Sequence, residues 1–306
     1  MRRDQASRPA KPEARIEPSP SRAQAIAQVA AYLVECGVDA GQAQDDARAL
    51  LRAATGLSRL QLAMSPQAPL SDVEADRLSR YAARRAAREP VSRILGQRGF
   101  WTLDLTVAAN VLDPRPDTEA LVETTLALTE KPDAPLTILD LGAGSGAITC
   151  ALLSELPAAR AVAVDISPDA CVATQANIAR CGLSGRASVL RGRWGDALAG
   201  KFDIIVSNPP YVRAGDIAGL EPEVRLYDPT LALDGGADGL DCYREIVADL
   251  PRLLAPNGLV AFEVGSDQAV SVASLLGARG FSIARVGRDA GGHERVVAAR
   301  RAPPRS

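Results

Sequence analysis

Residues 137–147 read Thr-Ile-Leu-Asp-Leu-Gly-Ala-Gly-Ser-Gly-Ala, and this stretch decides the fold. An apolar strand predicted over 136–141 runs directly into the glycines, and a helix predicted over 147–156 follows them. Glycines let the backbone turn tightly and let a ligand approach the main chain, while the start of a helix presents free amide groups. The pattern therefore predicts a strand–loop–helix unit with a ligand at its loop. A glycine-rich connection without a ligand is the simpler alternative.

Further short apolar runs follow this unit at the spacing of strands. They are predicted at 161–164, 187–190, 202–207, 259–264, 281–286 and 295–299. Helical segments lie between them, and one begins at Ser167, a preferred N-cap residue, with Pro168 at its first position. The last strand should pair back after the glycine turn at 291–292. Alternation of this kind predicts an α/β fold with a Rossmann-like, mostly parallel open sheet and helices on both faces.

The part of the chain before this sheet has a different character. Residues 1–20 carry several prolines among charges and have almost nothing to bury, which predicts a disordered tail. Residues 21–90 combine apolar residues at helical spacing with a capping box at Ser71-Asp-Val-Glu74, which predicts a small helical domain. Near-alternation within 91–116 predicts a β-hairpin linker, so that the α/β domain occupies 117–306.

The composition of the 306-residue chain excludes several classes of protein. Lys and Arg total 35 against 37 for Asp and Glu, so the chain lacks the positive surplus of a dedicated duplex-DNA binder. The single histidine, His293, argues against a His-based metal centre or a Ser-His-Asp triad, and no metal site is expected. The five cysteines are widely spaced, which favours reduced thiols in the cytoplasm. We expect neither a membrane span nor a secretory signal, because no apolar run is long enough.

The glycine loop suits two classes of cofactor. Gly142, Gly144 and Ala147 satisfy the G-x-G-x-x-G/A dinucleotide fingerprint, and Asp165 stands where an acid would hold a ribose. The adenosine half of S-adenosylmethionine presents the same ribose hydroxyls. Asp140 favours the second cofactor, because a carboxylate there would repel a pyrophosphate but could pair with the ammonium group of the methionine end.

A second motif, Asn208-Pro-Pro-Tyr211, stands at the end of the strand predicted over 202–207. Ligands of such sheets bind beyond the carboxyl ends of the strands, so this motif should face the same crevice as the glycine loop. The prolines fix the backbone and Tyr211 adds a flat wall. The side-chain oxygen of Asn208 and the backbone oxygen of Pro209 could each accept one hydrogen of a planar NH2 group and so turn its nitrogen toward a methyl donor. A rigid strand exit with an exposed tyrosine is the alternative.

The two motifs resemble those of the class I S-adenosylmethionine-dependent methyltransferases and, more narrowly, of the HemK/PrmC family. The resemblance covers roughly residue 21 to the C-terminus. It includes 111–123, 232–240 and 262–265, and its more specific parts are Pro-Arg-Pro-Asp-Thr-Glu within 111–123 and Asp-Gly-Gly-Ala-Asp-Gly-Leu within 232–240. The sequence departs from the family pattern at two positions. Asp113 stands where the family usually has an apolar residue, and Ala143 stands where it often has threonine.

The resemblance implies a class I methyltransferase sheet and a helical substrate-recognition domain, joined by the hairpin. It implies an enzyme that uses S-adenosyl-L-methionine to methylate the side-chain amide of the glutamine in the Gly-Gly-Gln motif of peptide chain release factors. Residue by residue, it assigns the cofactor to Asp140, Gly142, Ala143, Gly144, Ser145, Gly146, Asp165, Trp194 and Asn208. It assigns the substrate slot to Asn208, Pro209, Pro210 and Tyr211, with Asn208, Pro209 and Tyr211 as the catalytic residues. From chemistry alone, Trp194 could instead be a core aromatic.

Other functions stay open at this point. A ribosomal-protein glutamine could be the acceptor, or an adenine amine in nucleic acid, although the latter needs base flipping and a basic domain. An NAD-dependent oxidoreductase is disfavoured by Asp140 and by the lack of a well-placed histidine, and a non-catalytic cofactor-binding module would leave the slot unexplained. We expect a cytoplasmic monomer that contacts neither membrane nor nucleic acid. A stripe of arginines in the helical domain is either a solvated face or a docking surface for an acidic release factor; it comprises Arg77, Arg80, Arg84 and Arg88.

Overall fold

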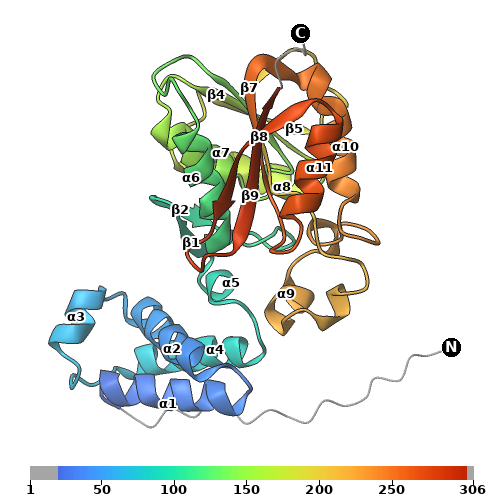
Figure 1. Ribbon diagram of the computed structural model, residues 1–306. Coiled ribbons are helices and arrows are strands. Elements are labelled where there is room, and N and C mark those ends of the chain that lie inside the picture. Colours follow the sequence, from blue (N-terminus) through green and yellow to red (C-terminus); the bar gives the residue numbers. More distant parts are fainter. Residues whose placement is uncertain (1–19, 302–306) are drawn as a thin grey trace. The chain divides into compact units, whose positions relative to one another are not determined.

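The computed structural model describes residues 20–301, so the tail predicted over 1–20 lies, apart from its last residue, outside the described residues. The chain divides by its internal contacts into two units, Met1–Leu95 and Gly96–Ser306 (Figure 1). The boundary falls inside 91–116, which the sequence treats as one linker. Helix α5 (Val91–Leu95) contacts α2 and α4 of the first unit, whereas the antiparallel hairpin of β1 (Gln97–Phe100) and β2 (Leu103–Thr106) belongs to the second.

The described part of the first unit is helical, as expected. Its other helices are α1 (Arg22–Glu35), α2 (Ala40–Thr55), α3 (Arg59–Met64) and α4 (Asp72–Ala86). The capping box at Ser71 forms in both directions, and Gly56 ends α2 in the left-handed conformation at φ 71°. Apolar side chains at helical spacing meet in one core that includes Leu33, Leu50, Leu51 and Leu78. The short helix α3 was not expected.

Two charged features of this unit stabilise it from within. Arg85 of α4 and Asp46 of α2 form an ion pair of 2.6 Å, with side chains only 4% and 6% exposed. Three arginines of the basic stripe bind the unit's own chain: Arg77 donates to the Ala54 carbonyl, Arg84 to the Glu89 carboxylate and Arg88 to a carbonyl on the loop after α1. These side chains are therefore engaged in holding loops and helix ends together.

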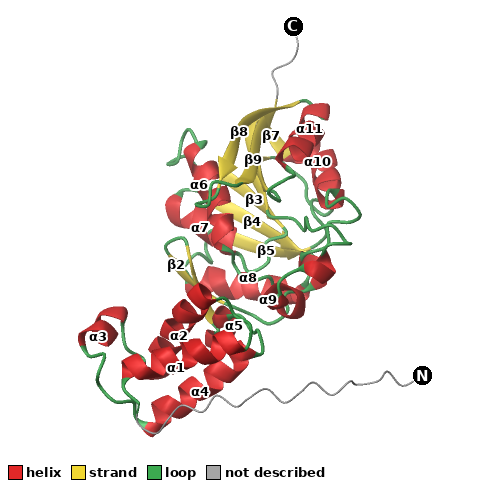
Figure 2. Cartoon of the chain, turned by 60° about the horizontal axis from the view of Figure 1, so that its bottom comes forward, coloured by secondary structure: helices red, strands yellow, loops and turns green. Residues whose placement is uncertain are grey.

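The second unit is built on the open, mostly parallel sheet that the sequence predicts (Figure 2). Its strand order is β5-β4-β3-β6-β7-β9-β8, and β9 alone runs opposite to the other strands, antiparallel to both β7 and β8. The strands are β3 (Thr137–Leu141), β4 (Arg160–Asp165), β5 (Ala187–Arg191), β6 (Phe202–Ser207), β7 (Leu254–Glu263), β8 (Phe281–Arg288) and β9 (Glu294–Arg301).

Helices cover both faces of this sheet because successive side chains of each strand point to opposite sides. In β3, Ile138 packs into a core cluster with α6 and α7, whereas Leu139 packs into a second cluster with α10 and α11. Figure 2 shows the two layers. The helices are α6 (Glu119–Ala127), α7 (Ala147–Glu155), α8 (Pro168–Arg180), α9 (Pro222–Tyr227), α10 (Asp241–Leu253) and α11 (Ala269–Ala278), with short 3-10 turns η1 (Pro116–Thr118), η2 (Ile217–Gly219) and η3 (Thr230–Ala232).

The hairpin is attached to the glycine loop through one buried side chain. Asn177 of α8 accepts from the Thr106 amide at 2.8 Å and donates to the carbonyls of Thr106 and Ser145 at 3.1 and 2.9 Å. Asp113, the departure noted in the sequence, is only 1% exposed and pairs at 2.9 Å with Arg98 of β1. The charge at this position is thus compensated by the hairpin itself.

Among residues 20–301 no helix combines the length and the apolar character needed to cross a bilayer. In the same residues no three His, Cys, Asp or Glu side chains gather as metal ligands.

Candidate active site

The carboxyl ends of four neighbouring parallel strands meet at one edge of the sheet. Leu141 of β3 is in register with Val164 of β4 and with Ser207 of β6, and Ser207 is in register with Phe262 of β7. The residues that follow these positions therefore lie side by side at that edge; they are Gly142, Asp165, Asn208 and Glu263. A cavity of about 380 Å³ opens there.

The cavity is lined by some of the cofactor and substrate residues predicted from the sequence. Its lining includes Gly142, Gly144, Asp165, Trp194, Asn208 and Pro210. The remaining predicted residues do not line the cavity; they are Asp140, Ala143, Ser145, Gly146, Pro209 and Tyr211. Lining residues that the sequence did not predict as site residues include Asn110, Ser167, Leu231, Asp234, Cys242 and Glu245.

The glycine loop has the conformation that requires glycine. Gly142, Gly144 and Gly146 have φ of 74°, 57° and 77°. A Cβ on Gly146 would lie 2.9 Å from Cγ2 of Thr174, and one on Gly142 would lie 3.4 Å from the Trp194 ring. The loop therefore packs directly on α8 at one end and leaves the cavity open at the other.

Asp165 is oriented by backbone amides on both sides of the cavity. Its Oδ2 accepts from the Gly144 amide and its Oδ1 from the Ser167 amide, each at 2.8 Å. Burial raises the pKa of this carboxyl, and the two amide hydrogen bonds oppose that rise. Each oxygen keeps a lone pair that could accept a ligand hydroxyl.

Asp140 is completely buried beneath the loop. One carboxylate oxygen accepts from the Thr149 hydroxyl at 2.6 Å, while Oδ1 has no hydrogen-bond partner among the described residues. Burial raises the pKa of Asp140 to about 6, against the hydrogen bonds from Thr149, and the nearby Asp165 adds to the rise. A buried carboxylate with an unsatisfied oxygen fits a cationic ligand group nearby, such as the ammonium of S-adenosylmethionine, better than a pyrophosphate.

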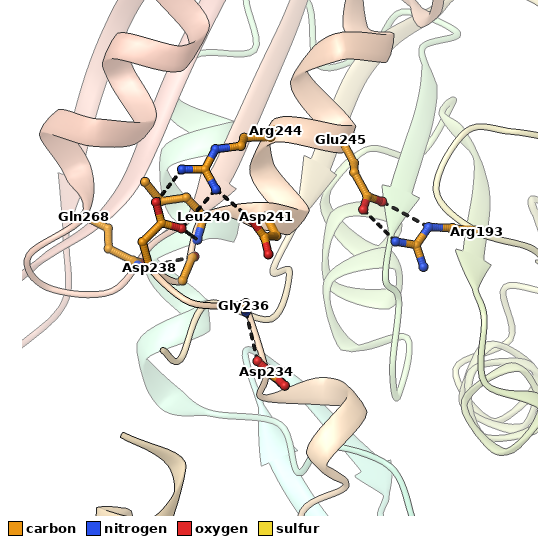
Figure 3. A network of polar contacts seen from close by, with 10 residues as sticks. Arg193, Asp234, Gly236, Asp238, Leu240, Asp241, Arg244, Glu245 and Gln268 are labelled. Carbon is orange, nitrogen blue, oxygen red and sulfur yellow. Dashed lines mark hydrogen bonds and ion pairs between the residues drawn. The ribbon is translucent and has the colours of Figure 1, made fainter. Parts of the chain in front are cut away.

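Trp194 lies on the cavity wall, where its ring borders Gly142, and also contacts the second core cluster. Its backbone has φ 43°, and its Nε1 donates to Oε2 of Glu245 at 2.7 Å. Arg193 holds the same carboxylate with two hydrogen bonds of 3.0 and 2.6 Å (Figure 3). Arg193 is the main cause of the lowered pKa of Glu245, so this carboxylate stays charged and fixes the ring.

The slot residues are held by polar contacts behind the cavity. Nδ2 of Asn208 donates to Oγ1 of Thr118 at 3.2 Å, and the Tyr211 hydroxyl faces Oε1 of Glu263 at 3.5 Å. Tyr211 is therefore turned toward β7 and does not line the cavity as a wall. Nε2 of Gln268 donates to the Tyr211 carbonyl at 3.0 Å and fixes the backbone of the slot.

The glycine-rich segment at 232–240 packs against this backbone. A Cβ on Gly235 would lie 2.8 Å from the Pro210 oxygen, and one on Gly239 would lie 2.4 Å from the Tyr211 oxygen. Asp234 accepts from the Gly236 amide, and Arg244 binds Asp238 and Asp241 where the segment enters α10 (Figure 3). The segment thus closes one side of the slot at a distance only glycine allows.

Comparison with known proteins identifies families that match parts of this chain. Residues 24–96 match the model of the PrmC N-terminal domain, and residues 112–220 match the methyltransferase small domain. A release factor glutamine methyltransferase from Rhodospirillum rubrum is 49% identical over 84% of this chain and 78% of its own length. One from Agrobacterium fabrum is 46% identical over 84% of this chain and 90% of its own length.

The chain belongs to the release factor glutamine methyltransferase family. A solved structure of a release factor-specific protein-(glutamine-N5) methyltransferase from Alicyclobacillus acidocaldarius is 32% identical and covers 65% of this chain and all of its own, with a TM-score of 0.40. The family resemblance inferred from the sequence is confirmed. Membership in a methyltransferase family implies S-adenosylmethionine as the methyl donor.

Three polar residues that support the site were not predicted from the sequence. Glu245, on α10, accepts a hydrogen bond from the Trp194 ring, and no local sequence pattern predicts this contact. Thr118 lies inside the Pro-Arg-Pro-Asp-Thr-Glu segment, and Glu263 lies inside the stretch at 262–265. A lone glutamate at the end of an apolar strand was the one available signal for a buried carboxylate.

Proposed function

We infer that this chain transfers the methyl group of S-adenosylmethionine to the side-chain nitrogen of the glutamine in the Gly-Gly-Gln motif of a peptide chain release factor. Family membership supports the substrate class. The observation that carries the inference is a single cavity lined by Asp165 and Trp194 together with Asn208 and Pro210. A cofactor held by the first pair would therefore meet an amide held at the second.

The residues at the glycine loop suit the parts of this cofactor. When bound, S-adenosylmethionine supplies an electrophilic methyl carbon on a sulfonium. Asp165 would accept hydrogen bonds from the ribose hydroxyls, Trp194 would stack on the adenine, and the buried charge of Asp140 would favour the cationic methionine end.

The slot residues would prepare the amide for attack. Its nitrogen is a poor nucleophile because the lone pair is delocalised into the carbonyl. The Asn208 side-chain oxygen and the Pro209 carbonyl would each accept one N–H bond and aim the nitrogen at the methyl carbon. The N–C bond forms as the C–S bond breaks, one amide proton leaves to water, and a neutral N-methylamide remains. We further propose that the enzyme acts as a monomer in the cytoplasm, where a translation factor would be its substrate.

The test is a transfer assay on an intact release factor. The purified chain, incubated with S-adenosylmethionine labelled in its methyl group, should label the glutamine of the Gly-Gly-Gln motif, as mapped by mass spectrometry. A release factor with alanine in place of that glutamine is the control and should stay unlabelled. Label on another residue, or no label with an active cofactor preparation, would disprove the proposal. Calorimetry should show binding of S-adenosylhomocysteine and none of NAD.

A further inference from the structure

The segment that follows α9 forms part of the cavity wall. Residues 229–236, which we call the wall segment, contribute Pro229, Leu231 and Ala232 to the lining. Leu231 is 60% exposed although it is apolar. An exposed leucine in a cavity lining is available to a ligand that fills the cavity. The proposed chemistry gives this segment no role so far.

The end of the wall segment is bound to the backbone of the glutamine slot. The Val212 amide donates to the Leu233 carbonyl, and the Gly235 amide donates to the Val212 carbonyl, both at 2.9 Å. Val212 directly follows the Asn-Pro-Pro-Tyr motif, and Gly235 packs against the Pro210 oxygen. A shift of the wall segment would therefore break these bonds or move the slot backbone with it.

The start of the wall segment is anchored by an ion pair. Asp228, directly before the segment, binds Arg115, which stands 113 positions earlier in the chain. The side chain of Asp228 is fully buried, whereas that of Arg115 is 31% exposed. A buried carboxylate is stable only when a partner compensates its charge. The pair thus fixes where the wall segment begins.

The short helix η1 connects this pair to the slot. Arg115 immediately precedes η1, and Thr118 at its other end accepts a hydrogen bond from Nδ2 of Asn208 at 3.2 Å. The cofactor residues are held by different contacts, since Asp165 binds backbone amides and Trp194 binds a glutamate of α10. Loss of the ion pair should therefore disturb the substrate side of the cavity and spare the cofactor side.

We propose that Arg115 and Asp228 are a positioning pair that holds the wall segment against the glutamine slot and so controls productive binding of the release factor. The proposal rests on the proposed function. Neither residue lines the cavity, so the pair acts through the wall segment and touches neither cofactor nor substrate. A guanidinium presents its donors in a fixed fork, which a lysine ammonium replaces only in part.

The test uses single and paired variants of the full chain. Arg115→Gln removes the charge, Arg115→Lys keeps it, and Asp228→Asn removes the partner charge with little change of shape. The double variant joins Arg115→Gln to Asp228→Asn. Arg300→Gln is the matched control. Arg300 is also 31% exposed and ties distant segments, the carbonyls of Leu128 and Asn257, but it is in register with Leu259, away from the carboxyl end of β7.

We expect Arg115→Gln to lower kcat/KM for the release factor about 10- to 100-fold, the scale of a misplaced substrate contact. The KM for S-adenosylmethionine and the affinity for S-adenosylhomocysteine should stay unchanged. Arg115→Lys should lose less, Arg300→Gln should lose nothing, and the double variant should be no worse than the weaker single one, because the contact is already gone. A wild-type kcat/KM in Arg115→Gln, additive losses in the double variant, or an equal loss of cofactor affinity would overturn the proposal.

Hydrogen exchange provides a readout that needs no substrate. The amides of Val212 and Gly235, which join the wall segment to the slot, should exchange faster in Arg115→Gln than in the wild-type chain. Amides of β3 should keep their protection, and Arg300→Gln should exchange like wild type at both positions. Equal exchange at Val212 and Gly235 in Arg115→Gln and wild type would refute the positioning role. A wild-type chain that fails to label the release factor would refute the proposed function instead.

Discussion

The Asp165 carboxylate accepts a hydrogen bond from the Gly144 amide at 2.8 Å, which ties the end of β4 to the middle of the glycine loop. Its other oxygen accepts from the Ser167 amide, so loop and helix α8 fix the carboxylate from both sides. A side chain held in this way needs no reorganisation when a ribose arrives, and the ligand gains affinity from that preorganisation.

Asp165→Ala should therefore weaken binding of S-adenosylhomocysteine about 10- to 100-fold, since hydrogen bonds to a charged group contribute about 1.5–3 kcal/mol. Calorimetry measures the change. Asp133→Ala, at an exposed residue before the amino end of β3, whereas the glycine loop follows its carboxyl end, is the control and should bind normally. Unchanged affinity in Asp165→Ala would place the ribose elsewhere.

The buried charge of Asp140 predicts two pH effects of opposite sign. Its pKa is about 6 in the folded chain, above the ordinary value of 3.8, so folding favours the neutral acid between these two pH values. The contribution of Asp140 to the free energy of unfolding should therefore fall as the pH rises from 3.8 to about 6, and it should stay low at higher pH. A cationic ligand prefers the ionised form, so affinity for S-adenosylhomocysteine should instead rise as pH increases through about 6.

Asp140→Asn isolates this effect from other acids of the site. The variant should melt at a higher temperature than wild type near neutral pH without ligand, because no buried charge remains. It should bind S-adenosylhomocysteine about tenfold more weakly there, with a flatter pH dependence. Calorimetry and thermal melts across the pH range would contradict the assignment if both proteins showed the same profile.

Asn208→Ala should separate cofactor binding from transfer. The substitution removes the side-chain oxygen proposed to grip the amide but leaves the glycine loop, Asp165 and Trp194 in place. Transfer to the release factor should fall by roughly 100-fold or more, as expected when an oriented polar group is lost from a reacting centre. Affinity for S-adenosylhomocysteine should change by less than about threefold. Full turnover in the variant would show that the amide is held elsewhere.

The sheet could be predicted because its strands are short apolar runs bounded by glycines, and the order of motifs placed the cavity at the right edge. The start of β7 could not. Leu254 pairs with Phe202, but the register then shifts across a polar stretch with Pro256 and Asn257, which hides the first half of the strand. Only the run from Leu259 onward shows the apolar pattern of a buried strand.

The cavity lining could be predicted only in part, because local motifs mark strand ends and not what lies behind them. Gly142, Asp165 and Asn208 each follow a recognisable strand. Thr118 meets Asn208, and Glu263 meets Tyr211, through contacts between segments far apart in the chain. Tyr211 belongs to a recognised motif, yet its hydroxyl faces that buried glutamate, a choice made by tertiary packing.

Gly146→Ala tests whether the loop must pack closely on α8. The new Cβ would meet the Thr174 side chain at 2.9 Å and the Thr174 Cα at 3.1 Å, in a backbone with φ 77°. We expect a loss of about 1–3 kcal/mol in the free energy of unfolding and weaker cofactor binding. Gly185→Ala, at a glycine with open space around it, should change neither. Equal denaturation midpoints for the two variants would argue against the packing explanation.

In the helical unit, the pair of Arg85 and Asp46 predicts a large effect from a single substitution. Asp46 is buried and also accepts from Gln42 at 2.6 Å, so Asp46→Ala would leave the buried guanidinium without its carboxylate. Breaking such a pair costs about 3–5 kcal/mol. Its neighbour Asp45 pairs with Arg48 on the exposed side of the same helix, and Asp45→Ala should cost under about 1 kcal/mol.

Hydrogen exchange on the whole protein can assign this loss to the helical unit. Amides of α2 and α4 should exchange faster in Asp46→Ala, while those of β3 and β6 keep their protection, because the two units have separate cores. The Asp45→Ala variant should exchange like wild type throughout. Similar exchange in α2 for both variants would mean that the buried pair contributes no more than an exposed one, and that its desolvation offsets its attraction completely.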